Sequence, residues 1–364
     1  MKQKVCFVTG ATGFIGQHIV SELVANKYKV IGIGKVGEIF CPEILNENKV
    51  KYIIKPELET SLLQRYDVEI ILGEISDKYF IEQIFNSIAR DNLELEFILH
   101  FAACATIQKA RDDEKLTWKT NYEGTENILI NSLQYQKKSL NKIKGFFHAS
   151  TDKVYGEGSL QTYHETDELK PLPYPYDKSK AKADELVRKI AKANNFPAII
   201  YRFCNVYGPG DYHKSRIIPG TLYRLLYTQE LPILKIYYDS SGKKQSFYRD
   251  MIYIKDLTRA IKLLLEHLSK STLNSNLIGE VFNLGTENTY PMQEVINKIK
   301  TYAHNNKKIK EEIVNRGEIK NQCMNYTKLN KLLGFKPQYS LDQGIEETVT
   351  WYTRHKGEID DKFI

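Results

Sequence analysis

The chain has 364 residues, enough for one large domain or two ordinary ones, and its 42% hydrophobic content suffices for a full core. A formal charge of +7 arises from 52 basic and 45 acidic side chains spread over the sequence, which argues against a concentrated nucleic-acid-binding surface. No apolar run approaches the roughly 20 residues of a membrane-spanning helix, and no signal-peptide pattern opens the chain, so we expect a cytoplasmic protein without a membrane partner.

Apolar runs alternate with amphipathic stretches through the first two thirds of the chain, which predicts an α/β fold with a parallel sheet. The expected strands are Val5–Thr9, Lys29–Ile33, Glu69–Leu72, Phe97–Phe101, Lys144–Ala149, Ala198–Arg202 and Val281–Asn283. The expected helices are Gly13–Ala25, Lys78–Asp91, Asn121–Gln136, Pro175–Asn194 and Ile254–His267. Residues 34–66 are long for a connection and are expected to carry a helix or a flap, whereas the tail after Gly357 is expected to be frayed.

A glycine-rich segment, TGATGFIG at Thr9–Gly16, lies between the first expected strand and the first expected helix. Glycines let the backbone approach a pyrophosphate, and the helix N-terminus offers N–H groups and the positive end of its dipole. The position predicts a Rossmann-type, doubly wound sheet that binds a dinucleotide. The expected cofactor contacts in this loop are Gly10, Thr12, Gly13, Phe14, Ile15 and Gly16.

The second expected strand should end near the adenosine ribose of that dinucleotide. An Asp or Glu there binds the ribose 2′-hydroxyl of NAD, but this strand runs into Gly34 and Lys35 without a carboxylate. A lysine can pair with the 2′-phosphate of NADP, so the sequence favours NADP over NAD. Glu38 keeps NAD open, because a slightly longer turn would bring its carboxylate back to the ribose.

Two later segments carry groups suited to acid–base chemistry. Tyr176 and Lys180 lie four residues apart on an expected helix, so they share a face, and a neighbouring ammonium favours the phenolate form of a tyrosine. Thr151 ends the fifth strand and is expected to bind the same substrate oxygen. The spacing alone is weak, since chance gives roughly three such pairs in this chain. We prefer the pair Tyr176 and Lys180 to the pair Tyr174 and Lys178, because Tyr174 precedes a proline and helical geometry is disfavoured there.

Taken together, these motifs resemble the extended short-chain dehydrogenase/reductase family. The resemblance also covers GEISD at 73–77, HFAA at 100–103, NYEGT at 121–125, NVYGPG at 205–210, RDMIY at 249–253 and LGFKP at 333–337. It implies an NADP- or NAD-dependent enzyme acting on a nucleotide-diphosphate sugar. It further implies a homodimer that pairs helices similar to Asn121–Gln136 and Pro175–Asn194.

The family resemblance also implies a division of the chain and a set of binding residues. A cofactor domain is expected at residues 1–205 with about 250–285, and a smaller C-terminal α/β substrate lobe at 206–249 with 286–364. Further cofactor contacts are implied at Glu74, Ile75, Phe101, Ala102, Ala103, Tyr176, Lys180 and Phe203. Substrate contacts are implied at Thr106, Asn205, Arg216 and Arg249, although a salt bridge is an alternative for each arginine. The five scattered cysteines lack metal-ligand spacing, so reduced thiols and no metal site are expected.

The residues after Thr151 separate activities within the family. Asp152 and Lys153 resemble the acid and the following Glu or Lys of sugar 4,6-dehydratases, where one group protonates the departing C6 hydroxyl and the other removes the C5 proton. The segment from Tyr207 to Gly220 resembles a branch labelled CDP-glucose or GDP-mannose 4,6-dehydratase-like. A nucleotide-sugar 4,6-dehydratase is therefore predicted. The alternatives are a C4 epimerase or 4-ketoreductase and, from another class, a non-catalytic dinucleotide-binding protein.

Overall fold

The computed structural model describes residues 3–35, 50–53, 67–91, 93–139, 142–157, 162–270, 277–314, 317–357 and 363. The chain divides into two compact units. The first unit comprises Met1–Thr151, Pro173–Arg202 and Ala260–Phe282, and the second comprises Asp152–Leu172, Phe203–Arg259 and Asn283–Ile364. None of the described helices is long and apolar enough to cross a membrane.

The first unit is built on a sheet with the strand order β12-β7-β6-β5-β1-β2-β4-β3 in the described part of the chain. Its strands are β1 (Lys4–Thr9), β2 (Lys29–Gly34), β3 (Val50–Ile53), β4 (Val68–Leu72), β5 (Glu94–His100), β6 (Gly145–Thr151), β7 (Ala198–Phe203) and β12 (Glu280–Leu284). From β6 to β3, every neighbouring pair is parallel. The central strands are almost wholly buried, as expected for a sheet covered on both faces.

The strand order reverses direction at β1, because β2 pairs with one of its edges and β5 with the other. At this point Thr9 lies opposite His100 in the parallel register. In open α/β sheets, ligands bind outside the carboxyl ends of the strands where the order reverses. The fold therefore places the segments after Thr9 and His100 at the expected ligand-binding edge.

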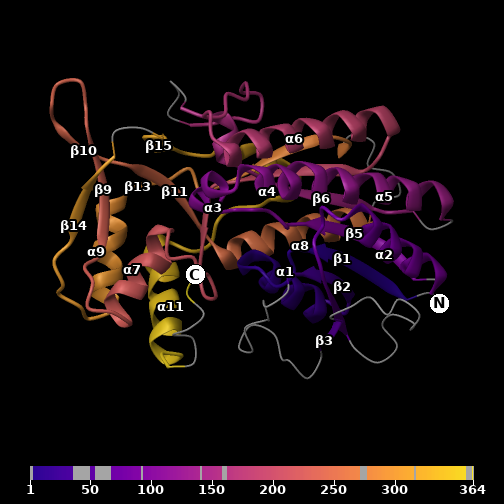
Figure 1. The fold of residues 1–364 in the computed structure, drawn as a ribbon, viewed down its shortest axis with the longest axis horizontal. Coiled ribbons are helices and arrows are strands. Elements are labelled where there is room, and N and C mark those ends of the chain that lie inside the picture. Colours follow the sequence, from indigo (N-terminus) through magenta and orange to yellow (C-terminus); the bar gives the residue numbers. More distant parts are fainter. Residues whose placement is uncertain are drawn as a thin grey trace. The chain divides into compact units, whose positions relative to one another are not determined.

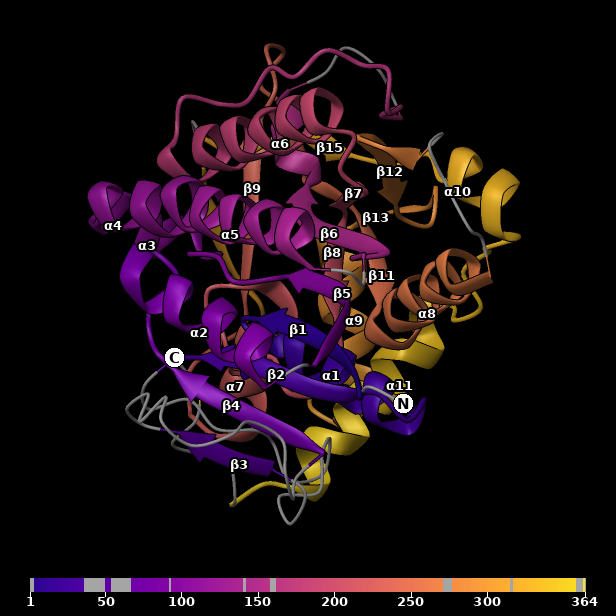
Figure 2. The ribbon, with the colours of Figure 1, turned by 90° about the vertical axis from the view of Figure 1, so that its right-hand side faces the viewer.

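Helices cover both faces of this sheet, as Figures 1 and 2 show. α1 (Phe14–Ala25) lies on one face, and α2 (Lys78–Arg90), α5 (Gly124–Lys138) and α6 (Pro175–Asn194) lie on the other. α2 illustrates the local cause: its buried residues Phe80, Ile81, Ile84, Phe85 and Ile88 recur at helical spacing. α3 (Ile107–Asp112), α4 (Glu114–Trp118) and a π-helical turn (Lys119–Glu123) lead into α5.

The second unit contains two small sheets. In one, β11 (Tyr248–Tyr253) pairs with β8 (Asn205–Tyr207), β13 (Thr289–Pro291) and β15 (Asn321–Gln322). In the other, the order is β10 (Lys244–Ser246), β9 (Ile233–Tyr238) and β14 (Lys310–Ile313). Its helices include α7 (Ile217–Leu226), α9 (Met292–Tyr302), α10 (Thr327–Leu333) and α11 (Leu341–Arg354). α8 (Ile254–Lys270) begins in this unit and ends in the first.

All expected strands and helices are present with ends close to those predicted, and the α/β fold class is confirmed. The sequence-based boundaries assigned residues 152–172 and 250–259 to the first unit, whereas the structure groups them with the second. The reason is long-range pairing: β11 joins strands of the second unit, and Tyr163 hydrogen-bonds to the backbone of Cys323. Within 34–66 the structure describes Gly34, Lys35 and β3, while the remaining positions, Glu38 included, lie outside the described residues.

A buried ion pair fixes α6 against the sheet. Arg202 on β7 donates two hydrogen bonds to the Asp184 carboxylate on α6, at 2.9 and 3.0 Å, and both side chains are fully buried. Ser150 on β6 donates a third hydrogen bond to the same carboxylate at 2.9 Å. A bidentate arginine contact is rigid, so the position of α6 relative to β6 and β7 is set at this point.

Replacement of Asp184 tests this anchor. Asp184→Asn leaves the Arg202 guanidinium buried without a compensating charge, so we expect the free energy of unfolding to fall by about 3–5 kcal/mol. The neighbouring Glu185→Gln is the control, because its ion pair with Lys182 is exposed and should be worth less than about 1 kcal/mol. Urea unfolding of both variants gives the comparison. Equal, small losses would show that the ion pair does not hold α6.

Candidate active site

The loop after β1 turns where no side chain fits. Gly10 has φ 66°, and a Cβ on it would lie 2.8 Å from the backbone nitrogen of Ala102. A Cβ on Gly16 would lie 1.9 Å from the carbonyl oxygen of Gly10. α1 begins at Phe14 without a side-chain cap from Gly13, and the first N–H groups of a helix have no partner within the helix. This narrow backbone cradle at a helix N-terminus fits the pyrophosphate of a dinucleotide.

The other expected cofactor residues stand next to strand ends. Ala102 donates a backbone hydrogen bond to the Thr9 hydroxyl at 3.2 Å, which joins the segment after β5 to the end of β1. Lys35 is exposed directly after β2. The remaining positions follow β4 or β5 or end β7: Glu74, Ile75, Phe101, Ala103 and Phe203. Of these, Ile75 is buried. Its side chain packs so closely against Gly124 that a Cβ on Gly124 would lie 2.6 Å from it.

α6 carries the expected tyrosine and lysine on its first turn and a half. Lys180 is buried, and its ammonium donates a hydrogen bond to the carbonyl of Ala149 at 2.5 Å, close to the strand end at which Thr151 stands. Tyr176 lies one helical turn before Lys180, on the same face. In the other candidate pair, Tyr174 is the extended N-cap residue, with the Arg111 guanidinium over its ring, and Lys178 is exposed.

Burial governs the charge of the groups around Lys180. It lowers the pKa of Lys180 to about 8, although Asp184, one turn further along α6, opposes this shift. Burial and then the Lys180 charge also lower the pKa of His100 to about 3 and that of His148 well below its usual range. The two imidazole rings stack with centroids 5.4 Å apart. Both histidines are therefore neutral near pH 7 and add no positive charge next to Lys180.

The structure adds one residue that the sequence analysis did not select as a site residue. Asn121 is buried in the π-helical turn and donates a hydrogen bond from Nδ2 to the Ser179 hydroxyl at 3.0 Å. Ser179 in turn donates to the carbonyl of Tyr176 at 3.0 Å. The Asn121 amide also bonds both backbone groups of Cys104. Asn121 thus ties the start of α6 to the loop after β5, and its motif, NYEGT, was the available signal.

Asp152 and Lys153 follow Thr151 on a 3₁₀ turn, Asp152–Tyr155. Adjacent residues on an extended strand point to opposite faces, and a turn removes this restriction. The turn closes where the Gly156 nitrogen donates to the Lys153 carbonyl at 3.2 Å, and Gly156 has φ 74°. Asp152 is buried, whereas Lys153 is partly exposed. The chain thus leaves the strand directly after Thr151, which allows both side chains to serve one substrate.

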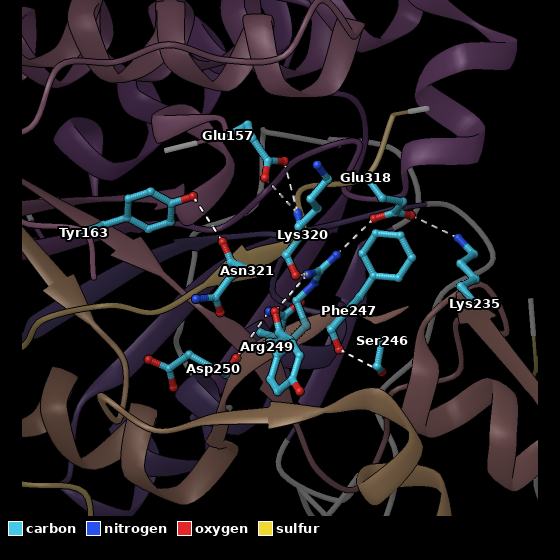
Figure 3. Close-up of polar contacts among 12 residues, drawn as sticks. Glu157, Tyr163, Lys235, Ser246, Phe247, Arg249, Asp250, Glu318, Lys320 and Asn321 are labelled. Carbon is cyan, nitrogen blue, oxygen red and sulfur yellow. Dashed lines mark hydrogen bonds and ion pairs between the residues drawn. The ribbon is translucent and has the colours of Figure 1, made fainter. Parts of the chain in front are cut away.

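Within the second unit, Arg249 lies in a network of charges (Figure 3). Its guanidinium donates to Glu318 at 3.2 Å and to the carbonyls of Tyr248 and Lys320. Lys235 reaches the same Glu318 carboxylate at 3.0 Å. Burial raises the pKa of Glu318, but Lys153, Lys235 and Arg249 outweigh this effect and hold it below its usual value. Arg249 thus makes a salt bridge and two hydrogen bonds to backbone carbonyls within the second unit.

The other expected substrate residues are more accessible or have unused hydrogen-bonding capacity. The Arg216 side chain is 32% exposed and bonds the Asp211 carboxylate at 2.9 Å. Asn205 is partly exposed and donates to the Asp250 carbonyl at 3.2 Å. The Thr106 hydroxyl is buried and has no hydrogen-bond partner in the part of the chain that the structure describes. Thr106 belongs to the first unit, whereas the other three belong to the second.

Comparison with known proteins agrees with this geometry. Among curated relatives, the chain is 26% identical over 379 residues to dTDP-glucose 4,6-dehydratase of Escherichia coli, which covers 95% of this chain and 91% of the relative. It is 26% identical over 359 residues to a trifunctional enzyme of Arabidopsis thaliana, named as UDP-glucose 4,6-dehydratase, 3,5-epimerase and reductase. That match covers 97% of this chain but 47% of the larger enzyme.

Solved structures and a family model extend the agreement. The dTDP-glucose 4,6-dehydratase of Bacillus anthracis, solved in complex with NAD, superposes with a TM-score of 0.74 at 26% identity, covering 97% of each chain. The model of the GDP-mannose 4,6-dehydratase family matches residues 7–348. These comparisons confirm the predicted enzyme class, an NAD(P)-dependent nucleotide-sugar 4,6-dehydratase. The chain therefore belongs to the GDP-mannose 4,6-dehydratase family, within the extended short-chain dehydrogenases/reductases.

Proposed function

We propose that Thr151, Tyr176 and Lys180 oxidise C4 of a nucleotide-activated hexose and that Asp152 and Lys153 then eliminate water from C5 and C6. A nicotinamide dinucleotide held by the backbone cradle at Gly10–Gly16 would supply the hydride acceptor for C4 and the hydride donor for C6. Tyr176 removes the proton of the C4 hydroxyl while Thr151 hydrogen-bonds the same oxygen. The buried Lys180 ammonium stabilises the phenolate of Tyr176.

The elimination needs one base and one acid in addition to this set. Oxidation at C4 acidifies the C5 proton, which Lys153 accepts in its uncharged form. Asp152, in its protonated form, donates to the C6 hydroxyl, which leaves as water. After the hydride has reached C6, Lys153 returns a proton to C5. No net oxidation or reduction results.

The observation that supports these roles most strongly is the turn after β6. Asp152 and Lys153 stand one and two residues after Thr151, on 3₁₀ backbone rather than on a continued strand. A C4 epimerase or 4-ketoreductase would use Thr151, Tyr176 and Lys180 without them. A non-catalytic dinucleotide-binding protein is disfavoured by the buried Lys180, because an ammonium is costly to bury and is retained where its charge has a use.

The nucleotide diphosphate is proposed to bind the residues that the family resemblance implied. Arg216 is the better placed of the two arginines, because its guanidinium is partly exposed while Arg249 is nearly buried. Asn205 and Thr106 supply neutral hydrogen-bonding groups. The nucleotide base and the hexose are left open by these groups. The homodimer and the cytoplasmic location stay predictions.

The cofactor preference rests on Lys35. We propose that NADP binds more tightly than NAD, because Lys35 is exposed directly after β2 and can pair with a 2′-phosphate. In Lys35→Glu, the ratio of the dissociation constants should shift toward NAD by about tenfold or more. Fluorescence titration with both cofactors measures it, with the exposed Lys27→Glu as the control for net charge. Tighter binding of NAD by the unaltered chain would refute the preference.

Lys180 and Lys178 offer a matched pair of variants on one helix. Lys180→Met should lower kcat by about 10²–10⁴-fold, because Tyr176 loses its cationic neighbour. Lys178→Met removes an exposed lysine and should leave kcat within about twofold. Steady-state rates and melting temperatures are compared for both. Near-normal turnover by Lys180→Met, or equal losses in the two variants, would contradict the assignment of the catalytic pair.

Lys153→Met tests the step that distinguishes a dehydratase. We expect release of the dehydrated product to fall by about 10²-fold or more, together with C5 deuterium exchange, while transient cofactor reduction persists. Lys170→Met is the control, since that lysine is exposed and pairs with the exposed Glu168. Mass spectrometry in deuterium oxide follows exchange and product in one sample. Dehydration at a near-normal rate would remove Lys153 from the mechanism.

A further inference from the structure

The side chain of Phe363 is buried although the tail after Gly357 was expected to be frayed. Its relative exposure is 6%, and its ring packs among four tyrosines, which we call the tyrosine box: Tyr212, Tyr223, Tyr227 and Tyr352. The ring centroids lie between 5.0 and 5.7 Å from that of Phe363. Aromatic pairs at such distances stabilise one another beyond the area that they bury. All five residues belong to the second unit.

The tyrosine box is joined by hydrogen bonds to the segment that carries Arg216. The Tyr352 hydroxyl donates to the backbone carbonyl of Asp211 at 2.5 Å, and Tyr227 donates to the carbonyl of Tyr352 at 3.0 Å. Asp211 is 2% exposed. Its carboxylate accepts hydrogen bonds from Arg216 at 2.9 Å and from the backbone of His213 at 3.3 Å. A continuous chain of contacts thus runs from Phe363 through Tyr352 and Asp211 to the Arg216 guanidinium.

Residues 208–216 need the contacts from the tyrosine box because their own backbone can adopt many conformations. They include Gly208 and Gly210, which both have positive φ angles, 154° and 82°. Arg216 itself precedes α7 as the N-cap residue and offers no side-chain hydrogen bond to the helix. A flexible arginine loses rotamer entropy when a ligand orders it. The Asp211 contact orders the guanidinium before any ligand arrives, which reduces that cost.

We propose that Phe363 is a positioning residue for nucleotide-diphosphate binding: by filling the tyrosine box it holds Tyr352 on Asp211, and Asp211 holds Arg216 ready for the diphosphate. The inference rests on the proposed role of Arg216 and adds a distant residue to that site. Phe363 is buried and is not proposed to contact the diphosphate itself. Its effect passes through Arg216.

Calorimetric binding of UDP, GDP, CDP and dTDP to the full chain tests the proposal, and the tightest of the four is then used as the probe. Phe363→Ala should weaken binding of that probe by about tenfold, and Phe363→Leu should restore part of it. Arg216→Ala should weaken binding by at least as much. In the Arg216→Ala background, Phe363→Ala should have no further effect, because the two residues act through one contact. Binding of the dinucleotide cofactor should be unchanged in all four variants, the double variant included.

The control is Phe335→Ala, which removes a fully buried ring of the second unit that packs against Tyr326, outside the tyrosine box. It should lower the melting temperature without changing the affinity for the probe. Phe363 variants that only lower the melting temperature, or effects of Phe363→Ala and Arg216→Ala that add fully, would overturn the proposal. Unchanged binding in Arg216→Ala, or no binding of any diphosphate, would instead refute the proposed substrate contacts and the inference with them.

Discussion

The buried contact between Asp184 and Arg202 is the constraint on which the catalytic geometry depends. Tyr176 and Lys180 lie on α6, and Thr151 lies at the end of β6. The placement of α6 against β6 therefore determines how these three side chains lie relative to one another. Arg202 and Ser150 bring β7 and β6 to the same carboxylate. Removing two charges from water is costly, so the pair contributes less to net stability than to specificity: it allows one placement of α6 and penalises others.

The same helix explains why a buried lysine is tolerated. Lys180 lies one turn before Asp184, whose charge partly offsets the cost of burying the ammonium. The neighbouring His100 and His148 are neutral, and His148 has no hydrogen-bond partner among the described residues. Two cationic imidazoles there would repel Lys180 and favour its neutral form. Lys180, one helical turn after Tyr176, therefore stays charged at pH 7, as its proposed role beside a phenolate requires.

The sequence was sufficient for features that depend on neighbouring residues. The bounds of α6 follow from Pro175 at its start and Asn195 in the left-handed conformation at its end. It was insufficient where residues distant in sequence meet. The hydrogen bond of Asn121 to Ser179 spans 58 positions. The expected frayed tail does not hold at Phe363, because three of its four tyrosine neighbours lie more than a hundred positions away. The grouping of residues 250–259 with the second unit likewise depends on distant residues, because β11 pairs with β13 and β15.

The central claim is elimination of water from a nucleotide-activated hexose, and the identity of the product tests it directly. The chain is incubated with UDP-, GDP-, CDP- and dTDP-hexoses and catalytic NAD or NADP, and products are followed by mass and by keto-group chemistry. A 4,6-dehydratase should convert at least one sugar, with loss of the mass of one water, to a 4-keto-6-deoxyhexose without net consumption of cofactor. Return of every sugar solely as its C4 epimer would contradict the claim.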